Sequence, residues 1–146
     1  MARIKKFEDL LSWQRARVLT QRVYRATKSG GFAKDFGLRD QIRRASVSIL
    51  SNIAEGFERG GDKEFQQFLS VAKCSCAEVR AQLYVALDEG YIEPKEFEEL
   101  KALTVEISRL ISGMMPYLAS SAVAGRKFKP ATDSRPKTLD SRLSKP

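Results

Sequence analysis

Histidine is absent from this 146-residue chain, cysteine occurs only twice, and there is no long apolar run. Without histidine the chain lacks the usual general base near neutral pH and the commonest transition-metal ligand, so we expect no metal, no cofactor and no enzymatic activity. Cys74 and Cys76 are two residues apart. On a helix this spacing separates two side chains by about 200°, which predicts two reduced, packed thiols and no disulfide.

Other absences narrow the class of protein. No apolar stretch approaches the roughly 18 residues that span a bilayer. The N-terminal sequence MARIKKFEDLLSW reaches charged residues and a tryptophan too soon for a secretory signal, so we expect a cytoplasmic protein. Hydrophobic residues make up 42% and charged residues 30% of the chain, which is the balance of a globular domain with its own core.

Positive charge is concentrated near the C-terminus of a chain whose net charge is +8. Residues 121–146 hold seven of the 26 Lys and Arg residues but two of the 18 Asp and Glu residues, set among Pro, Ser and Thr. This composition predicts a tail that is disordered unless a partner orders it. A basic tail favours a polyanionic partner, most often nucleic acid. The alternative is a solvated tail that keeps the protein soluble.

Helical periodicity runs through four segments, and none of them alternates as a strand would. The first helix is predicted from Glu8 to Lys28, where Ser29, Gly30 and Gly31 supply the stop. The other three are predicted from an N-cap at Asp35 to the stop at residues 59–61, from Asp62 to Glu89, and from Pro94 to a kink or end at Pro116.

Each predicted helix carries an apolar stripe for a common core. The second has two stripes, so it is either central to its domain or buried against another subunit. Long helices with short connections predict an all-α, antiparallel up-down four-helix bundle over residues 1–120, with residues 121–146 as a basic tail. The stripes are Ala16, Leu19, Val23 and Ala26; Leu38, Ile42, Ala45, Ile49 and Ile53, with Val47, Leu50 and Ala54; Phe65, Leu69, Ala72, Cys76, Val79, Leu83 and Ala86; and Phe97, Leu100, Leu103, Ile107, Leu110, Met114 and Tyr117.

Several arginines are candidates for contact with phosphate groups. Arg15, Arg22 and Arg25 align on one side of the first helix, and Arg39 and Arg43 are one turn apart on the second. Arg44 follows Asp40 by one turn, so the interpretation of Arg44 as an intrahelical ion partner competes with phosphate contact. The tail adds Arg126, Lys127 and Lys129 to the candidates. The alternative for the helix arginines is an ordinary solvated face.

The segment QIRRASVSILSNIAEGFERGG, residues 41–61, places Asn52 and Glu55 in an apolar helix. A buried carboxylate is costly unless it is paired, and Arg59, at i+4, is one candidate partner for Glu55. We interpret the two residues as a structural or interface device that specifies register or oligomeric state. The alternatives are an exposed helix end and, less favoured, a ligand site.

The same segment carries a family resemblance, together with FEDLLSWQRARVLTQRVYRAT and EGYI. The sequence resembles, over residues 7–118, the four-helix bundle proteins first noticed as products of intervening sequences within bacterial large-subunit ribosomal RNA genes. The resemblance implies a homopentamer and kinship with the accessory variability proteins of diversity-generating retroelements, which partner a reverse transcriptase and bind nucleic acid. The family pattern falls on residues that we assign to structure or the oligomer, namely Trp13, Gln41, Asn52, Glu55 and Arg59, and also on Arg43, Arg44, Ser48, Gly56 and Phe68.

The sequence departs from the family pattern where CSC replaces a usual Gly-Ser, at Pro116, and in its longer basic tail. We expect a non-enzymatic pentameric bundle that binds structured RNA or an RNA–protein complex, as an accessory subunit of a retroelement reverse transcriptase. The alternative is a self-assembling scaffold that binds another protein and no nucleic acid. A nuclease is disfavoured, because no histidine or clustered acidic metal site is present.

Overall fold

The computed structural model describes the backbone of residues 4–119 and the side chains of residues 4–115. Within that range the regular elements are five α-helices, four of them long, and one short 3-10 helix, with no strand. The all-α prediction is therefore confirmed. The elements are η1 (Phe7–Asp9), α1 (Leu11–Ala26), α2 (Gly30–Lys34), α3 (Phe36–Arg59), α4 (Asp62–Asp88) and α5 (Pro94–Ala119).

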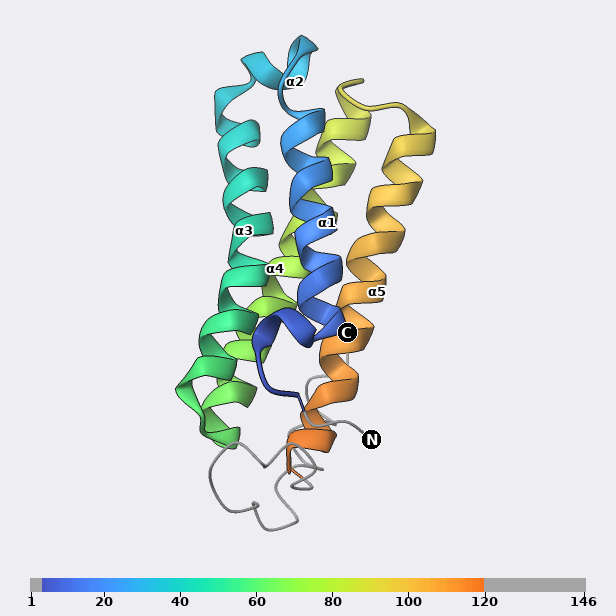
Figure 1. The fold of residues 1–146 in the computed structure, drawn as a ribbon. Coiled ribbons are helices and arrows are strands. Elements are labelled where there is room, and N and C mark those ends of the chain that lie inside the picture. Colours follow the sequence, from blue (N-terminus) through green and yellow to red (C-terminus); the bar gives the residue numbers. More distant parts are fainter. Residues whose placement is uncertain (1–3, 120–146) are drawn as a thin grey trace.

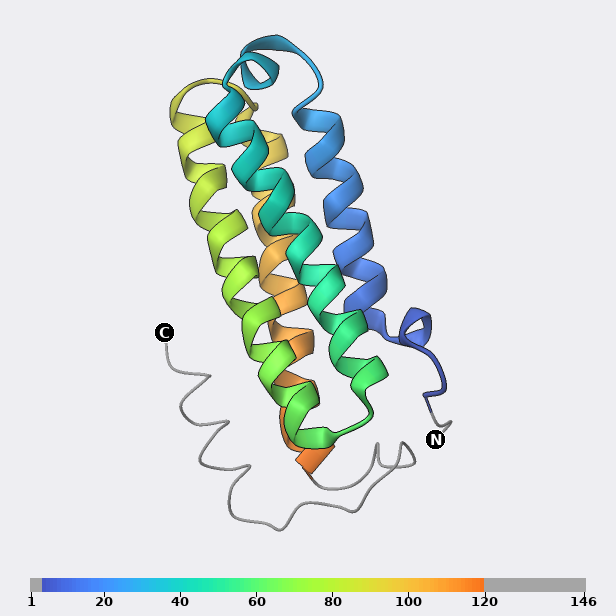
Figure 2. The ribbon, with the colours of Figure 1, turned by 90° about the vertical axis from the view of Figure 1, so that its left-hand side faces the viewer.

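The four long helices lie side by side as one bundle (Figures 1 and 2). Helix α3 packs against α1 and α4, and α5 also packs against α1 and α4, so the four helices surround a shared core. The turn between α3 and α4 lies at one end of the bundle, whereas α2 and the α4–α5 connection lie at the other end (Figure 1).

Most of the predicted stripes form this core, but the second stripe of α3, Val47, Leu50 and Ala54, is only half-buried, and the stripe of α5 shifts. The α5 stripe is confirmed up to Ile107. Beyond that residue the core continues on Ile111 and Met115, which are buried, while Leu110 and Met114 are half-buried. After Ile107 successive buried positions are four residues apart, whereas the prediction placed the next one three residues on. A helical repeat of 3.6 residues allows either spacing, so packing against the neighbouring helices decides between them.

The first predicted helix is divided in two. Phe7–Asp9 form η1, and α1 runs from Leu11 to Ala26 rather than from Glu8 to Lys28. Leu10, between the two helices, has an extended backbone and is 8% exposed. Because Leu10 turns into the core, the chain leaves the helical path at this residue.

Helix α2 is not predicted from the sequence, where its two glycines indicate only a stop. Gly30 has a φ of +66°, which suits glycine, and the helix continues through Phe32, which is 1% exposed. The Phe32 ring stacks on Tyr91 with 5.3 Å between centroids. Burial of Phe32 thus converts the expected loop into a helical turn that closes one end of the core.

The helix boundaries around α3 and α5 follow local chemistry. Asp35 accepts a hydrogen bond from the Leu38 N–H at 3.1 Å, which confirms the predicted N-cap, and Gly60 ends α3 with a φ of +83°. Helix α5 begins at Pro94, as predicted, but continues through Pro116 to Ala119. The helix does not end at the second proline, and a kink there, the other outcome expected from its missing N–H and its ring, stays a prediction.

Candidate functional site

Two of the three candidate arginines on α1 are ion-paired across the bundle surface. Arg15 contacts Glu106 of α5 with 3.1 Å between Nη2 and Oε1, and Arg22 contacts Glu99 with 2.9 Å between the same atom types. These pairs join α1 to α5 and partly neutralise both arginines. Arg25 is exposed, and no ion pair or hydrogen bond links it to another residue of the described range. Of the three, Arg25 can meet a polyanion without displacing a carboxylate.

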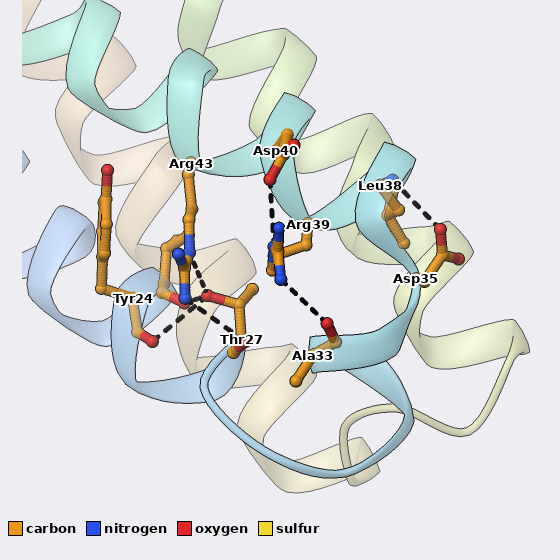
Figure 3. A network of polar contacts seen from close by, with 9 residues as sticks. Tyr24, Thr27, Ala33, Asp35, Leu38, Arg39, Asp40 and Arg43 are labelled. Atoms are coloured by element: carbon orange, nitrogen blue, oxygen red, sulfur yellow. Dashed lines mark hydrogen bonds and ion pairs between the residues drawn. The ribbon is translucent and has the colours of Figure 1, made fainter.

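Arg39 and Arg43 hold the chain between α1 and α3 (Figure 3). Arg43 Nε donates to Thr27 Oγ1 at 2.7 Å, and Nη2 donates to the Thr27 carbonyl at 3.3 Å. The guanidinium therefore satisfies a carbonyl at the C-terminus of α1, where positive charge also suits the helix dipole. Arg39 donates to the Ala33 carbonyl and to Asp40, each at 3.0 Å. Both predicted phosphate contacts are thus already engaged in holding the fold together.

The ion pair predicted between Asp40 and Arg44 is not formed. Asp40 pairs with Arg39 instead, because the bond to the Ala33 carbonyl holds the Arg39 guanidinium beside that carboxylate (Figure 3). Arg44 is exposed and has no ion pair in the part of the chain that the structure describes. It lines a shallow groove with Asp40 and Ser48 of its own helix and Glu78 of α4. Of the two neighbouring arginines, Arg44 is the available cation and Arg43 is the occupied one.

Asn52 and Glu55 have separate environments within one chain. The half-buried Asn52 amide donates to the Ser48 carbonyl at 2.8 Å and to its hydroxyl at 3.0 Å. The Ser48 hydroxyl lies 2.9 Å from that of Ser75, so this network crosses from α3 to α4. Glu55 is exposed and pairs with Arg59 at 3.3 Å, the partner that the spacing predicts. A role for either residue in register between subunits stays a prediction.

Trp13 and Gln41, the other residues assigned to structure or the oligomer, contact neighbouring elements. The Trp13 ring packs edge-on against Phe7 with 5.1 Å between centroids. Its indole N–H is buried with no hydrogen-bond partner among the described residues. Gln41 is exposed and accepts a hydrogen bond from Gln82 Nε2 at 3.2 Å, linking α3 to α4. Trp13 therefore secures η1 on α1, and Gln41 adds to the α3–α4 contact.

The three tail candidates lie outside the described residues. These are Arg126, Lys127 and Lys129. Their contact with phosphate and the dependence of the tail on a partner for order stay predictions. Among the candidates on the bundle, Arg25 and Arg44 are the two whose side chains have neither an ion pair nor a hydrogen bond within residues 4–115.

Sequence reasoning missed a cation–aromatic cluster where α4 meets α5. Lys101 Nζ lies 5.5 Å from the ring centroid of Tyr84 and 5.7 Å from that of Phe97. Arg80 lies one turn before Tyr84 on α4, and Phe97 lies one turn before Lys101 on α5. The available signal was a cation and an aromatic one turn apart on each helix, but each pair alone is too common to single out. Only the packing of α4 against α5 brings the two pairs together.

The two cysteines of α4 differ in exposure. Cys76 is buried, and burial raises the pKa of its thiol to about 12, so the thiol stays protonated and unreactive near neutral pH. Cys74 is exposed, which corrects the prediction that both thiols are packed, because the two side chains point to opposite sides of α4. The two thiols are unbridged, as predicted.

Residues 4–119 show neither a metal-binding cluster nor a membrane span. No three His, Cys, Asp or Glu side chains in this range lie close enough to hold a metal ion. None of the helices described has the length and hydropathy required to cross a membrane.

Comparison with known proteins places most of this bundle in one family pattern. A sequence model of the family described as 23S rRNA-intervening sequence protein matches residues 8–113. The match begins within η1, extends through most of α5 and ends before the basic tail. A search of curated proteins finds no match.

Proposed function

The chain belongs to the 23S rRNA-intervening sequence protein family, and we propose that it is a helical bundle that binds RNA and has no enzymatic activity. The family description names a ribosomal RNA, which suits a role connected with nucleic acid. The observation that carries the proposal is the exposure of Arg25 and Arg44, neither of which has an acidic partner in the described range. Such cations release counterions when they meet phosphates, which favours binding.

We assign different tasks to the candidate arginines. Arg25 and Arg44, with Arg126, Lys127 and Lys129 of the tail, are the proposed phosphate contacts. Arg15 and Arg22 are weaker candidates, because each must leave a carboxylate to bind a phosphate. Arg39 and Arg43 position the surface by holding the turn before α3, and their hydrogen bonds leave less capacity for a ligand.

The proposal extends to an up-down arrangement of the helices and to assembly as a homopentamer. The second apolar stripe of α3, Val47, Leu50 and Ala54, is only half-buried, and Val71 and Val85 of α4 are 49% and 45% exposed. These surfaces support association with further copies of the chain. Sedimentation equilibrium is expected to give five times the chain mass, and a monomer would contradict the assembly.

A reverse transcriptase of a retroelement is the protein partner that we propose for the assembled bundle, in the cytoplasm. A basic bundle surface and a basic tail suit an accessory subunit that holds RNA beside a polymerase. Copurification of the chain with a reverse transcriptase encoded next to it is the expected result. Separate elution of the two proteins at low salt would contradict this partner without affecting RNA binding.

A salt titration tests RNA binding. Affinity for an RNA hairpin should fall steeply as salt rises, and the slope of log K against log salt should shrink by about 0.7–0.9 for each phosphate contact removed. The double variant Arg25→Ala and Arg44→Ala should lower the slope, as should deletion of residues 121–146. The double variant Arg15→Ala and Arg22→Ala removes the same number of charges from existing ion pairs, so it is the matched control and should lower the slope less. A wild-type protein that binds neither the hairpin nor duplex DNA at low salt would overturn the proposal.

The second candidate is a self-assembling scaffold that binds protein and no nucleic acid. The exposed apolar side chains of α4 favour this alternative, since such residues are common at protein interfaces. A stable oligomer by light scattering, combined with no RNA binding at any salt concentration, would select the scaffold.

A further inference from the structure

The α4–α5 seam holds an exposed tyrosine ring in a defined position. Tyr84 is 45% exposed, although one edge of its ring packs on Phe97 with 4.9 Å between centroids and 66° between planes. Phe97 itself is 3% exposed and so belongs to the core. Contact with the buried Phe97 therefore holds the Tyr84 ring in place while a large part of the ring faces solvent. A nucleic-acid base can stack on an aromatic ring held in this way.

Two cations flank this ring. Lys101 lies over Tyr84 and Phe97, and a hydrogen bond with Tyr84 raises the pKa of Lys101, so the ammonium group keeps its charge well above neutral pH. Arg80 lies one turn before Tyr84 on α4, and its charge opposes the rise in the pKa of Lys101 by repulsion. Glu98 is the acidic residue nearby, but neither cation forms an ion pair within the described range.

The other cation–aromatic pairs among the described residues differ in one respect. In each of these pairs the arginine already donates a hydrogen bond to another residue of the fold. Arg39 over Phe36 donates to Asp40, Arg43 over Tyr24 donates to Thr27, and Arg59 over Phe68 pairs with Glu55. The Lys101 ammonium group has three donors and lies over the Tyr84 ring without an ion pair, and Arg80 has no hydrogen-bond partner in the described range. The Tyr84 cluster therefore combines an exposed ring with unused donors.

We propose that Tyr84, Arg80 and Lys101 bind an unpaired nucleotide of single-stranded RNA, with its base on the exposed part of the Tyr84 ring and its flanking phosphates on the two cations. The proposal deepens the RNA-binding function proposed above and rests on it. Stacking on an aromatic side chain tolerates any base, so this site selects unpaired RNA over duplex without reading a sequence. The geometry gives the bundle a means of recognising loops that Arg25 and Arg44 alone do not provide.

Fluorescence anisotropy with a fluorescein-labelled single-stranded oligouridine at low salt tests the site. Tyr84→Ala should weaken binding by about tenfold, because loss of one stacked base has an effect of that order. Tyr84→Phe keeps the ring and should bind within about twofold of the wild type on the same reasoning. Phe36→Ala is the matched control, since Phe36 is 63% exposed beside an arginine that is already engaged.

The salt dependence separates the roles of the ring and the cations. The double variant Arg80→Met and Lys101→Met should lower the slope of log K against log salt by about 1.4, whereas Tyr84→Ala should leave that slope unchanged. Ultraviolet crosslinking of the same oligouridine, mapped by mass spectrometry, should identify the peptide that contains Tyr84. Circular dichroism of each variant verifies that the helices are retained.

Three outcomes would overturn the inference. These are unchanged affinity in Tyr84→Ala, an equal loss in Phe36→Ala, and a wild-type protein that binds the hairpin duplex but not the oligouridine. The third outcome leaves the proposed RNA-binding function in place. Binding to neither RNA would overturn that function as well.

Discussion

Helices α3 and α4 approach closely at Gly56 and are linked by a pair of serines, whereas α1 and α5 are joined at the surface by two arginine–glutamate pairs. At the first seam Gly56 lies so close to α4 that an added Cβ would be 2.6 Å from the Cβ of Phe68. At the second seam Arg15 and Glu106 are 37% and 44% exposed. One contact therefore depends on close packing and the other on charges that water still reaches.

The two seams account for two groups of residues that look functional in the sequence. The small polar residues within the apolar segment of α3 serve the first seam, because Ser48 links Asn52 to Ser75 of α4. The arginines aligned on α1 mostly serve the second seam, because Arg15 and Arg22 pair with α5. Polar residues in a helix are thus weak indicators of a ligand site until their partners are known.

Gly56→Ala should have the largest effect on stability, a loss of about 1–3 kcal/mol, because the added methyl group overpacks the α3–α4 seam. The methyl group would meet the Cβ of Phe68, which cannot move without the backbone, and Phe65 Cδ1 at 2.9 Å. Gly113→Ala on α5 is the control, since nothing lies within 4 Å of the position that its added methyl group would take. The control should be neutral or stabilising by up to about 1 kcal/mol. Equal urea midpoints for Gly56→Ala and the wild type would refute the close approach.

The thiol of Cys76 reports whether water reaches the core on the buried side of α4. In the folded protein burial raises the pKa of the thiol from 9.0 to about 12, so the folded state keeps a proton that the unfolded chain loses. The Cys76 thiol therefore makes its full contribution to the free energy of unfolding below the pKa of the unfolded state. This contribution falls as the pH rises towards the pKa of the folded state. From about pH 8 to about pH 10 this residue should lower the free energy of unfolding by about 1.4 kcal/mol.

The measurement compares the pH dependence of urea unfolding in the wild type and in Cys76→Ala, which lacks the thiol. Cys74→Ala is the control, because Cys74 is exposed. Identical pH profiles for the wild type and Cys76→Ala would show that water reaches the thiol.

Ser75→Ala should cost about 1 kcal/mol, because it removes the hydrogen bond between Ser48 and Ser75. Ser75 is 6% exposed, so water cannot easily replace the lost partner. Ser51→Ala on the exposed side of α3 gives the same change in composition and should stay within about 0.5 kcal/mol of the wild type. Equal losses in the two variants would indicate that the serine pair contributes nothing specific.

The surface pair Arg15–Glu106 should have the smallest effect. A double-mutant cycle with alanine at each position should give a coupling of about 0.5 kcal/mol that decreases with added salt, because both side chains are partly exposed. A coupling several times larger and independent of salt would place the α1–α5 seam in the same class as the α3–α4 seam.

Much of the fold could be predicted from the sequence because its signals are local. The N-cap at Asp35, the start of α5 at Pro94 and the end of α3 before Gly60 each depend on residues within one helical turn. The division of the first helix at Leu10 and the helical turn at Phe32 were missed. Both depend on side chains that bury themselves in a core formed by distant helices.

The candidate site was less predictable than the fold. The predicted ion pair between Asp40 and Arg44 was wrong, because Asp40 pairs with Arg39. Arg43, predicted to contact phosphate, already donates a hydrogen bond to Thr27. The spacing of one turn allows a pair but does not select it over a competing carbonyl or carboxylate nearby. The surface of a helix offers each charged side chain several possible partners, and each exposed pair contributes little free energy.

By itself the sequence determined four long helices, most of their core stripes, the absence of a histidine-based site and the family pattern over residues 8–113. The helices and their stripes follow from the spacing of residues within one helix, and the absence of histidine follows from composition, so neither depends on contacts between distant segments. Only the tertiary structure decided which cations are engaged and which remain available. It also brought Tyr84 to Lys101, because such contacts join helices that lie far apart in sequence and form only when the core has packed.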